Sequence, residues 1–485
     1  MANELSNRLN DPPVTGRSER WALLSYMSPG TLVVLAIALV TSVIVLVVPS
    51  GKRQGMEFWV FARVHHAMYE EQVTKWNAAA DEEGQKQINM ILIDYQTMVR
   101  RTLAAFWSDI PSADMIEMER SQIGNFLTGP LEEVGFVDLT DRIHDEGIYE
   151  RINPPSFSPW TKAGRIFGLP HDVHPVLLCY RADIVEAAGI DVNEIETWDD
   201  FARVMRPLIK DLDGDGTIDR YLLNAWYASK SWIDPLTIQA GGGTFDGNNE
   251  LIINCEANAK VLAQMVSWCL DGPTRIAIDT RHGTQSGNEL WLEGRVIATI
   301  MPDWMAGIFK TDMPGLGGKV KLMPLPASER GGRRTSVWGG TMVGIPKSSA
   351  HFEQAWRFAK ELYLSKYLAK RLFQTNNIIT PVREYWDADF YKEPDPYFTG
   401  QASGLLYLEQ APHVPLRNSS PFHNRGTARL SEATVQLHDY AARQGLYKQE
   451  DLLPKARELL AEAERVMQLE ISRNVFIGGD GETTP

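Results

Sequence analysis

Residues 56–118 alternate between short apolar segments and segments with helical spacing, and this alternation limits the possible folds more than any other feature. Residues 56–61 are dense in aromatic and β-favouring residues, residues 88–93 are an apolar run of strand length, and a third short segment follows at 113–118. The segments between them carry apolar residues three or four positions apart, such as Tyr69 and Val73. Strands that alternate with helices at this interval predict an α/β fold with a largely parallel sheet.

The length of 485 residues exceeds the roughly 250 to 300 that one hydrophobic core usually serves, so we expect two packed lobes. The net charge of -14, without a long basic block, argues against nucleic acid as a partner. The three cysteines, Cys179, Cys255 and Cys269, have no paired spacing and lie in apolar surroundings. We therefore expect buried free thiols and no disulfide framework.

Residues 164–201 contain several local secondary-structure signals in a distinctive order. Gly164 opens a turn and an extended run, a polar loop follows at 171–174, residues 175–180 form an apolar strand, and a helix stops at Gly189. This order resembles the hinge-crossing segment of the extracytoplasmic solute-binding proteins of ABC importers, in the sugar-binding, maltodextrin-binding-like family. There, "GxxYGLP", a polar loop, a strand ending in Tyr and "AAGI…TWDDF" follow one another, and Phe167 stands here where Tyr is common.

The resemblance covers roughly residues 56–470 and implies a two-lobed periplasmic-binding-protein fold of type II. It places residues 51–168 and 324–375 in lobe 1, and residues 169–323 and 376–472 in lobe 2. It also implies a protein without enzymatic activity or organic cofactor that binds a sugar or oligosaccharide between the lobes and delivers it to the transmembrane subunits of an ABC permease. There are two alternatives: a ligand sensor for a signalling partner, and a binder of a non-sugar solute.

The amino-terminal region predicts a membrane anchor. Residues 31–48 contain no charged residue and nearly reach the roughly 20 residues that span a bilayer. We expect a flexible tail at 1–27, an uncleaved transmembrane signal anchor at 28–50 and a disordered tail at 473–485. A cleaved signal peptide is the alternative for residues 28–50. The resemblance places everything after the anchor outside the cytoplasm, in the periplasm or at the cell surface.

Ligands of α/β sheets bind where the carboxyl ends of the strands converge, so the polar residues that follow the predicted strands are candidates to hold sugar hydroxyls. These residues are Arg63, His65, Glu119, Gln122, Asp172 and His174. Solvated loop residues are the alternative for each. His171, Asp172 and His174 are a weaker candidate for a metal site, and Glu119, Asp172 and Asp303 for a pair of glycosidase carboxylates.

Aromatic side chains that stack on the apolar faces of sugar rings are the second requirement of a saccharide site. The resemblance implies this role for Trp226 and Trp304. It adds Asp303 beside Trp304, the glycine loop with Trp338 and Gly340, and His423 as further cleft residues. Motifs for phosphate loops, zinc proteases and serine hydrolases are absent from the sequence, which agrees with a binding function.

Residues 211–219 reproduce most of a calcium-binding loop. Oxygen ligands occupy the expected spacing at Asp211, Asp213, Asp215, Thr217 and Asp219, although Leu222 replaces the final bidentate glutamate. We expect a weak structural Ca²⁺ site, and an acidic turn without an ion is the alternative.

Overall fold

The computed structural model describes residues 28–47, 55–108, 110–280 and 283–473. The chain divides into a unit at residues 1–54 and a unit at residues 55–485. The first unit contains one described helix, α2 (Pro29–Val47). Within the described ranges, no helix combines the length and the hydropathy that a membrane crossing requires. Residues 48–50 of the expected anchor, the expected tail at 1–27 and nearly all of the carboxyl-terminal tail lie outside the described residues.

The first sheet of the larger unit confirms the predicted α/β alternation. Its strand order is β2 (Ile88–Leu92), β1 (Met56–Val60), β3 (Met115–Glu119), β11 (Thr341–Gly344) and β6 (Leu169–Pro170). Strand β1 is parallel to both of its neighbours, whereas β11 runs antiparallel to β3 and β6. The parallel part of this sheet is therefore the part that the sequence pattern predicted.

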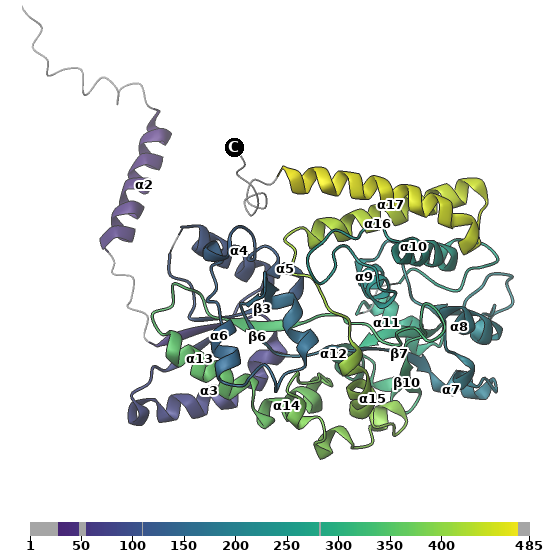
Figure 1. Ribbon diagram of the computed structural model, residues 1–485, viewed down its shortest axis with the longest axis horizontal. Helices are drawn as coiled ribbons and strands as arrows, with labels where there is room; N and C mark the ends of the chain where they lie inside the picture. The colour runs from purple at the N-terminus through teal and green to yellow at the C-terminus, as the bar shows by residue number, and fades with distance from the viewer. Residues whose placement is uncertain (1–27, 48–54, 109, 281–282, 474–485) are drawn as a thin grey trace, which may run out of the picture. The chain divides into compact units, whose positions relative to one another are not determined.

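Alternate side chains of the first sheet enter different cores, as the two-residue period of a strand requires. Phe58 packs with the core on the side of helices α3 (Arg63–Glu83), α13 (Phe352–Tyr363) and α14 (Lys366–Asn376). Trp59 packs with the core on the side of α4 (Tyr95–Ser108). Figure 1 shows α4 across the sheet from α3 and α13.

The second sheet has the order β10 (Val320–Pro324), β7 (Val176–Arg181), β9 (Val296–Pro302) and β8 (Tyr221–Leu223). Every residue of β7 and β9 is buried, which explains their nearly continuous apolar sequence. Leu178 packs on the side of α9 (Lys230–Gln239), α10 (Glu256–Cys269), α16 (His423–Gln444) and α17 (Gln449–Ser472). Cys179 packs on the opposite side, with α12 (Asp303–Asp312) and α15 (Ser403–Gln410) (Figure 1).

The larger unit also contains several short α-helices and strands. They are α5 (Arg120–Ile123), α6 (Thr140–Asp145), β4 (Thr161–Lys162), β5 (Arg165–Ile166), α7 (Ala182–Ala187), α8 (Trp198–Met205) and α11 (Gln285–Leu292). Helix α8 begins with a capping box, in which Thr197 accepts from the backbone N–H of Asp200 while the Asp200 carboxylate accepts from that of Thr197. All three cysteines are free thiols, as predicted, but only Cys179 is buried, whereas Cys255 and Cys269 are half-buried.

The two passages between the sheets differ slightly from the expected lobe boundaries. Leu169–Pro170 pairs with β11 in the first sheet, so the chain leaves that sheet after Pro170 and not before residue 169. After β10, residues 325–338 stay beside the second sheet, where the Ala327 N–H donates to the carbonyl of Glu196 (2.7 Å). The return to the first sheet therefore comes near Gly339, later than the predicted position at 324.

Candidate functional site

A cavity of about 610 Å³ opens beside the second sheet, and three of the predicted tryptophans line it. The loop after β8 contributes Trp226, helix α12 contributes Trp304, and the segment returning to the first sheet contributes Trp338. The complete lining is Trp226, Ala228, Ser229, Lys230, Ser231, Trp232, Thr280, Gly283, Asn288, Trp304, Met305, Ile308, Phe309, Asp312, Met313, Trp338 and Ser431.

Trp304 and Trp338 form a rigid aromatic corner in this lining. Their ring centroids lie 5.5 Å apart at an interplanar angle of 81°. The indole Nε1 of Trp304 donates to the carbonyl oxygen of Trp338 at 2.9 Å. Both rings are half-buried, and so is Trp226. Each indole therefore combines a fixed position with a partly accessible surface, the arrangement that suits stacking on a flat apolar ligand face.

Polar side chains of the cavity were not among the predicted site residues. Lys230 begins helix α9, flanked by Ser229 and Ser231, and Asn288 and Asp312 come from α11 and α12. The one available signal was the polar triplet at 229–231 between two aromatic segments. These groups supply hydrogen-bond donors and acceptors beside the tryptophans.

Asp172, His174 and Asp303 are placed in a buried chain behind the aromatic corner, outside the cavity lining. His174 Nε2 lies 3.0 Å from an Asp172 oxygen, and His174 Nδ1 lies 2.6 Å from Asp303 Oδ1. Burial lowers the pKa of His174, but the two carboxylates outweigh it and raise that pKa to about 10. The imidazole is therefore a buried cation held between two anions.

Asp303 links this chain to the cavity wall. Its Oδ1 also accepts from the backbone N–H of Trp304 at 2.7 Å, and its Oδ2 accepts from the backbone N–H of Ile379 at 2.8 Å. The backbone of Gly339 passes close by, since a Cβ built there would lie 2.9 Å from the His174 ring and 3.1 Å from Trp304 Nε1. The buried chain thus fixes the position of Trp304 and does not itself face the ligand space.

His423 and Gly340, also predicted for the site, lie where α5 meets the start of α16. The backbone N–H of Arg120 donates to the Gly340 carbonyl at 2.9 Å, and Arg120 Nη2 lies 3.4 Å from His423 Nδ1. Burial, followed by the charges of Arg120 and Arg417, holds the pKa of His423 well below its usual range. His423 is therefore a neutral imidazole in a contact between segments some 300 residues apart in the sequence.

Glu119 and Gln122 lie at this same contact and have local partners. The carboxylate of Glu119 accepts from the backbone N–H of Ser121 at 2.9 Å and from the Tyr95 hydroxyl at 3.0 Å. Gln122 Oε1 accepts from Asn125 at 2.8 Å. Glu119 thus caps α5, and neither residue lines the tryptophan cavity.

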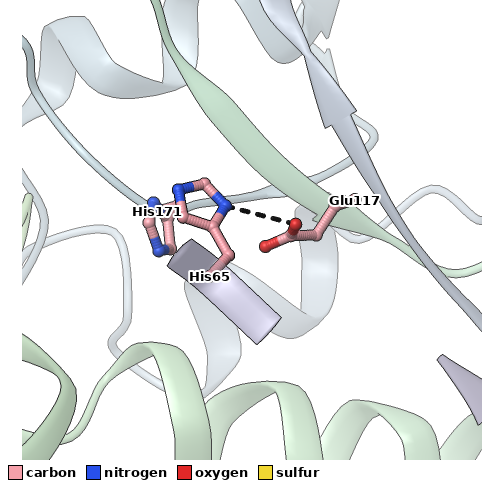
Figure 2. Close-up of side chains that lie close together, drawn as sticks. All are labelled: His65, Glu117 and His171. Carbon is pink, nitrogen blue, oxygen red and sulfur yellow. Dashed lines mark hydrogen bonds and ion pairs between the residues drawn. The ribbon is translucent and has the colours of Figure 1, made fainter. Parts of the chain in front are cut away.

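Arg63 and His65 were expected in a loop after β1, but α3 begins at Arg63 and both residues lie in its first turn. Arg63 is exposed, whereas His65 is buried and lies beside Glu117 and His171 (Figure 2). His65 Nδ1 is 3.3 Å from Glu117 Oε2. The weaker metal candidate, His171 with Asp172 and His174, is brought together as a hydrogen-bonded group, because His171 Nδ1 and His174 Nε2 each lie 3.0 Å from Asp172 Oδ2. His174 also pairs with Asp303, while His171 lies next to His65.

The predicted calcium loop is exposed at its tip and partly assembled. Carboxylate oxygens of Asp211, Asp213 and Asp215 lie within 4.8 Å of one another. Asp211 accepts from the backbone N–H groups of Gly214 (2.7 Å) and Gly216 (2.8 Å), which shapes the turn. Asp219 pairs instead with Arg295 (2.7 Å). The hard oxygen donors fit a calcium ion, with three carboxylates converging and a fourth engaged elsewhere.

Comparison with known proteins agrees with this architecture. The sequence model of the family described as "Bacterial extracellular solute-binding protein" matches residues 76–369. An arabinooligosaccharide-binding protein of Halalkalibacterium halodurans is 26% identical over 413 residues, which cover 83% of this chain and 88% of the relative. The protein of the same name from Bacillus subtilis is 28% identical over 353 residues, which cover 72% and 78%.

Solved structures show the same fold. The sugar-binding protein MalE from the phytopathogen Xanthomonas citri superposes with a TM-score of 0.65 at 18% identity, covering 85% of this chain and 99% of the other. The α/β two-lobed periplasmic-binding-protein fold that the sequence predicted is therefore confirmed.

Proposed function

Because the chain belongs to the bacterial extracellular solute-binding proteins, we propose that it binds an oligosaccharide in the tryptophan cavity and presents it to an ABC permease for import. The family consists of binding proteins without enzymatic activity. Binding at such a site shifts a two-lobed protein toward its closed state through contacts that only that state makes. The permease then recognises closure.

The cavity lining is the observation that carries this proposal. Trp226, Trp304 and Trp338 offer flat apolar surfaces, and Lys230 and Asp312 offer charged hydrogen-bonding groups around the same space. A sugar ring presents C–H faces that bury against indoles and hydroxyl edges that need polar partners. A volume of about 610 Å³ lies within the usual range of small-molecule sites, and it accommodates more than one sugar ring.

The names of the relatives narrow the class of ligand. Two are named for binding arabinooligosaccharides, and a third relative, 24% identical over 293 residues, is a lactose-binding protein of Rhizobium radiobacter. We therefore propose short neutral oligosaccharides, with arabino-oligosaccharides as the first to test.

Thermal unfolding with a panel of neutral oligosaccharides tests the proposal. A ligand that binds only the folded state raises the unfolding temperature by mass action. We expect an arabino-oligosaccharide to raise it for the wild type and for Trp107→Ala, whose indole is 81% exposed and remote from the cavity lining. Trp304→Ala should lose the rise. Equal rises in Trp304→Ala and Trp107→Ala, or no rise with any saccharide, would contradict the proposal.

We also propose that the protein is anchored in the membrane by its amino-terminal segment. It rests on the uncharged segment at residues 31–48. Cell fractionation with an alkaline carbonate wash tests it, because a protein held by a spanning helix stays in the membrane pellet. Release of the full-length chain by the wash, or an amino terminus that begins after residue 50, would refute the anchor.

Calcium binding at Asp211, Asp213 and Asp215 is likewise a proposal, supported by their converging carboxylates. The weak site would hold the loop before β8 in place.

A further inference from the structure

Two histidines and a glutamate from three separate segments meet in the first lobe, away from the tryptophan cavity. His65 comes from the first turn of α3, Glu117 from the middle of β3, and His171 from the loop that follows β6. All three side chains are buried, with exposed fractions of 7% for the His65 side chain and 0% for those of Glu117 and His171. Figure 2 shows His65 between His171 and Glu117, with a dashed line that joins His65 to Glu117.

The distance between the His65 and Glu117 donor atoms suits two ligands of one metal ion better than a strong ion pair. One donor atom from each residue lies within 4.8 Å of the other two. His65 Nδ1 and Glu117 Oε2 are 3.3 Å apart, longer than the roughly 2.7–2.9 Å of a charge-assisted hydrogen bond. Two ligands at zinc bond lengths of about 2.0–2.1 Å, in tetrahedral geometry, are separated by about 3.3 Å.

His171 carries a buried donor atom that has no other use. Its Nε2 is enclosed and, among the described residues, makes no hydrogen bond. Its other nitrogen, Nδ1, lies 3.0 Å from a carboxylate oxygen of Asp172. Metal-bound imidazoles commonly pair their second nitrogen with a carboxylate in this way, which fixes the tautomer and leaves Nε2 free to bind the ion.

Glu117 has the same kind of support. Its Oε1 accepts from the hydroxyls of Tyr69 (2.5 Å) and Tyr363 (2.8 Å), so Oε2 is the oxygen left toward His65. Hydrogen bonds of this type orient a ligating carboxylate. Two of the three proposed ligands, His171 and Glu117, therefore have supporting hydrogen bonds of the kind that orient metal ligands.

We propose that His65, Glu117 and His171 form a binding site for a divalent transition-metal ion, with Zn²⁺ the ion that this donor set fits best. Two imidazoles and one carboxylate form a borderline-soft set that suits Zn²⁺ and disfavours Ca²⁺ and Mg²⁺. Three protein ligands leave the fourth tetrahedral position for a water molecule. The ion would tie α3 and β3 to the loop in which the chain passes from the first sheet to the second.

The first experiment measures zinc bound to the full-length chain. The protein is stripped of metal with a chelator, loaded with Zn²⁺ and freed of excess metal. Elemental mass spectrometry then gives the number of zinc ions per chain. We expect about one tightly held equivalent for the wild type and for the matched control His144→Gln, since His144 is an exposed histidine of the same lobe. His171→Gln and Glu117→Gln should lower the affinity by about 100-fold or more, and Asp172→Asn by about 10–100-fold.

X-ray absorption at the zinc edge of the wild type gives an answer that does not depend on how well the variants fold. The proposal predicts two imidazole nitrogens and one or two oxygens at about 2.0–2.1 Å. Sulfur ligands, or a shell made of oxygen alone, would overturn it by placing the zinc at the cysteines or at the acidic loop. Failure of the wild type to retain zinc would also overturn it and would identify the cluster as a hydrogen-bonded network only.

Discussion

Replacing Asp303 with asparagine tests whether the buried Asp172–His174–Asp303 chain holds the cavity wall in place. The Asp303 carboxylate accepts three hydrogen bonds, from His174 Nδ1 at 2.6 Å, Trp304 N–H at 2.7 Å and Ile379 N–H at 2.8 Å. An asparagine has one acceptor oxygen and one amide group that only donates. Asp303→Asn therefore removes a negative charge from beside the buried His174 cation. The amide group of the new asparagine also faces at least one backbone N–H, so two donors meet.

The size of the effect follows from the burial of the pair. Asp303 is 0% exposed and His174 is 5% exposed, so water cannot replace the lost partner. Breaking one side of a buried ion pair typically costs about 3–5 kcal/mol. We expect Asp303→Asn to lower the free energy of unfolding by about that amount, and to weaken ligand binding because Trp304 loses its anchor.

Chemical denaturation of wild type, Asp303→Asn and Asp312→Asn provides the assay. Asp312 is an exposed aspartate at the other end of α12, so the same substitution there should change the free energy of unfolding by no more than about 0.5 kcal/mol. A loss below about 1 kcal/mol in Asp303→Asn, or equal losses in both variants, would refute the reasoning.

Three further predictions follow from individual contacts. The His174 pKa, raised by its carboxylates from about 6.5 to about 10, contributes stability that is complete below pH 6.5 and is lost as the pH rises toward 10. Thermal unfolding between pH 6 and 10 should show this loss in the wild type and a smaller one in Asp303→Asn. Gly340→Ala should cost about 1–3 kcal/mol by denaturation, since φ is +130° there and the new Cβ would lie 2.9 Å from Arg417; an unchanged midpoint would contradict this. Ca²⁺ should raise the unfolding temperature of the wild type, and Asp213→Asn should reduce that rise; an equal response in both would exclude the loop as the calcium site.

The sequence predicted the features of the fold that depend on neighbouring residues. The strand and helix periods at 56–118 are local patterns, and the structure has them. Trp226, Trp304 and Trp338 were identified through the resemblance, and they line the cavity.

The direction of each side chain depends on partners that are distant in the sequence. Local sequence patterns do not predict which distant residues come into contact. His171 and His174 lie in one loop and both contact Asp172. A φ of +59° at His174 turns the backbone there, so His174 also pairs with Asp303 while His171 lies beside His65. His423 meets Arg120 only because the two lobes pack together. Glu117 occupies an ordinary position within a strand, so only the fold reveals that it faces two histidines.

Oligosaccharide binding in the tryptophan cavity is tested most directly by a crystal structure of the protein with the oligosaccharide that most raises its unfolding temperature. We expect sugar rings in the cavity of about 610 Å³, stacked on Trp304 and at least one of Trp226 and Trp338, with hydroxyls near Lys230 or Asp312. A saccharide bound outside this lining, with the three indoles left uncovered, would contradict it.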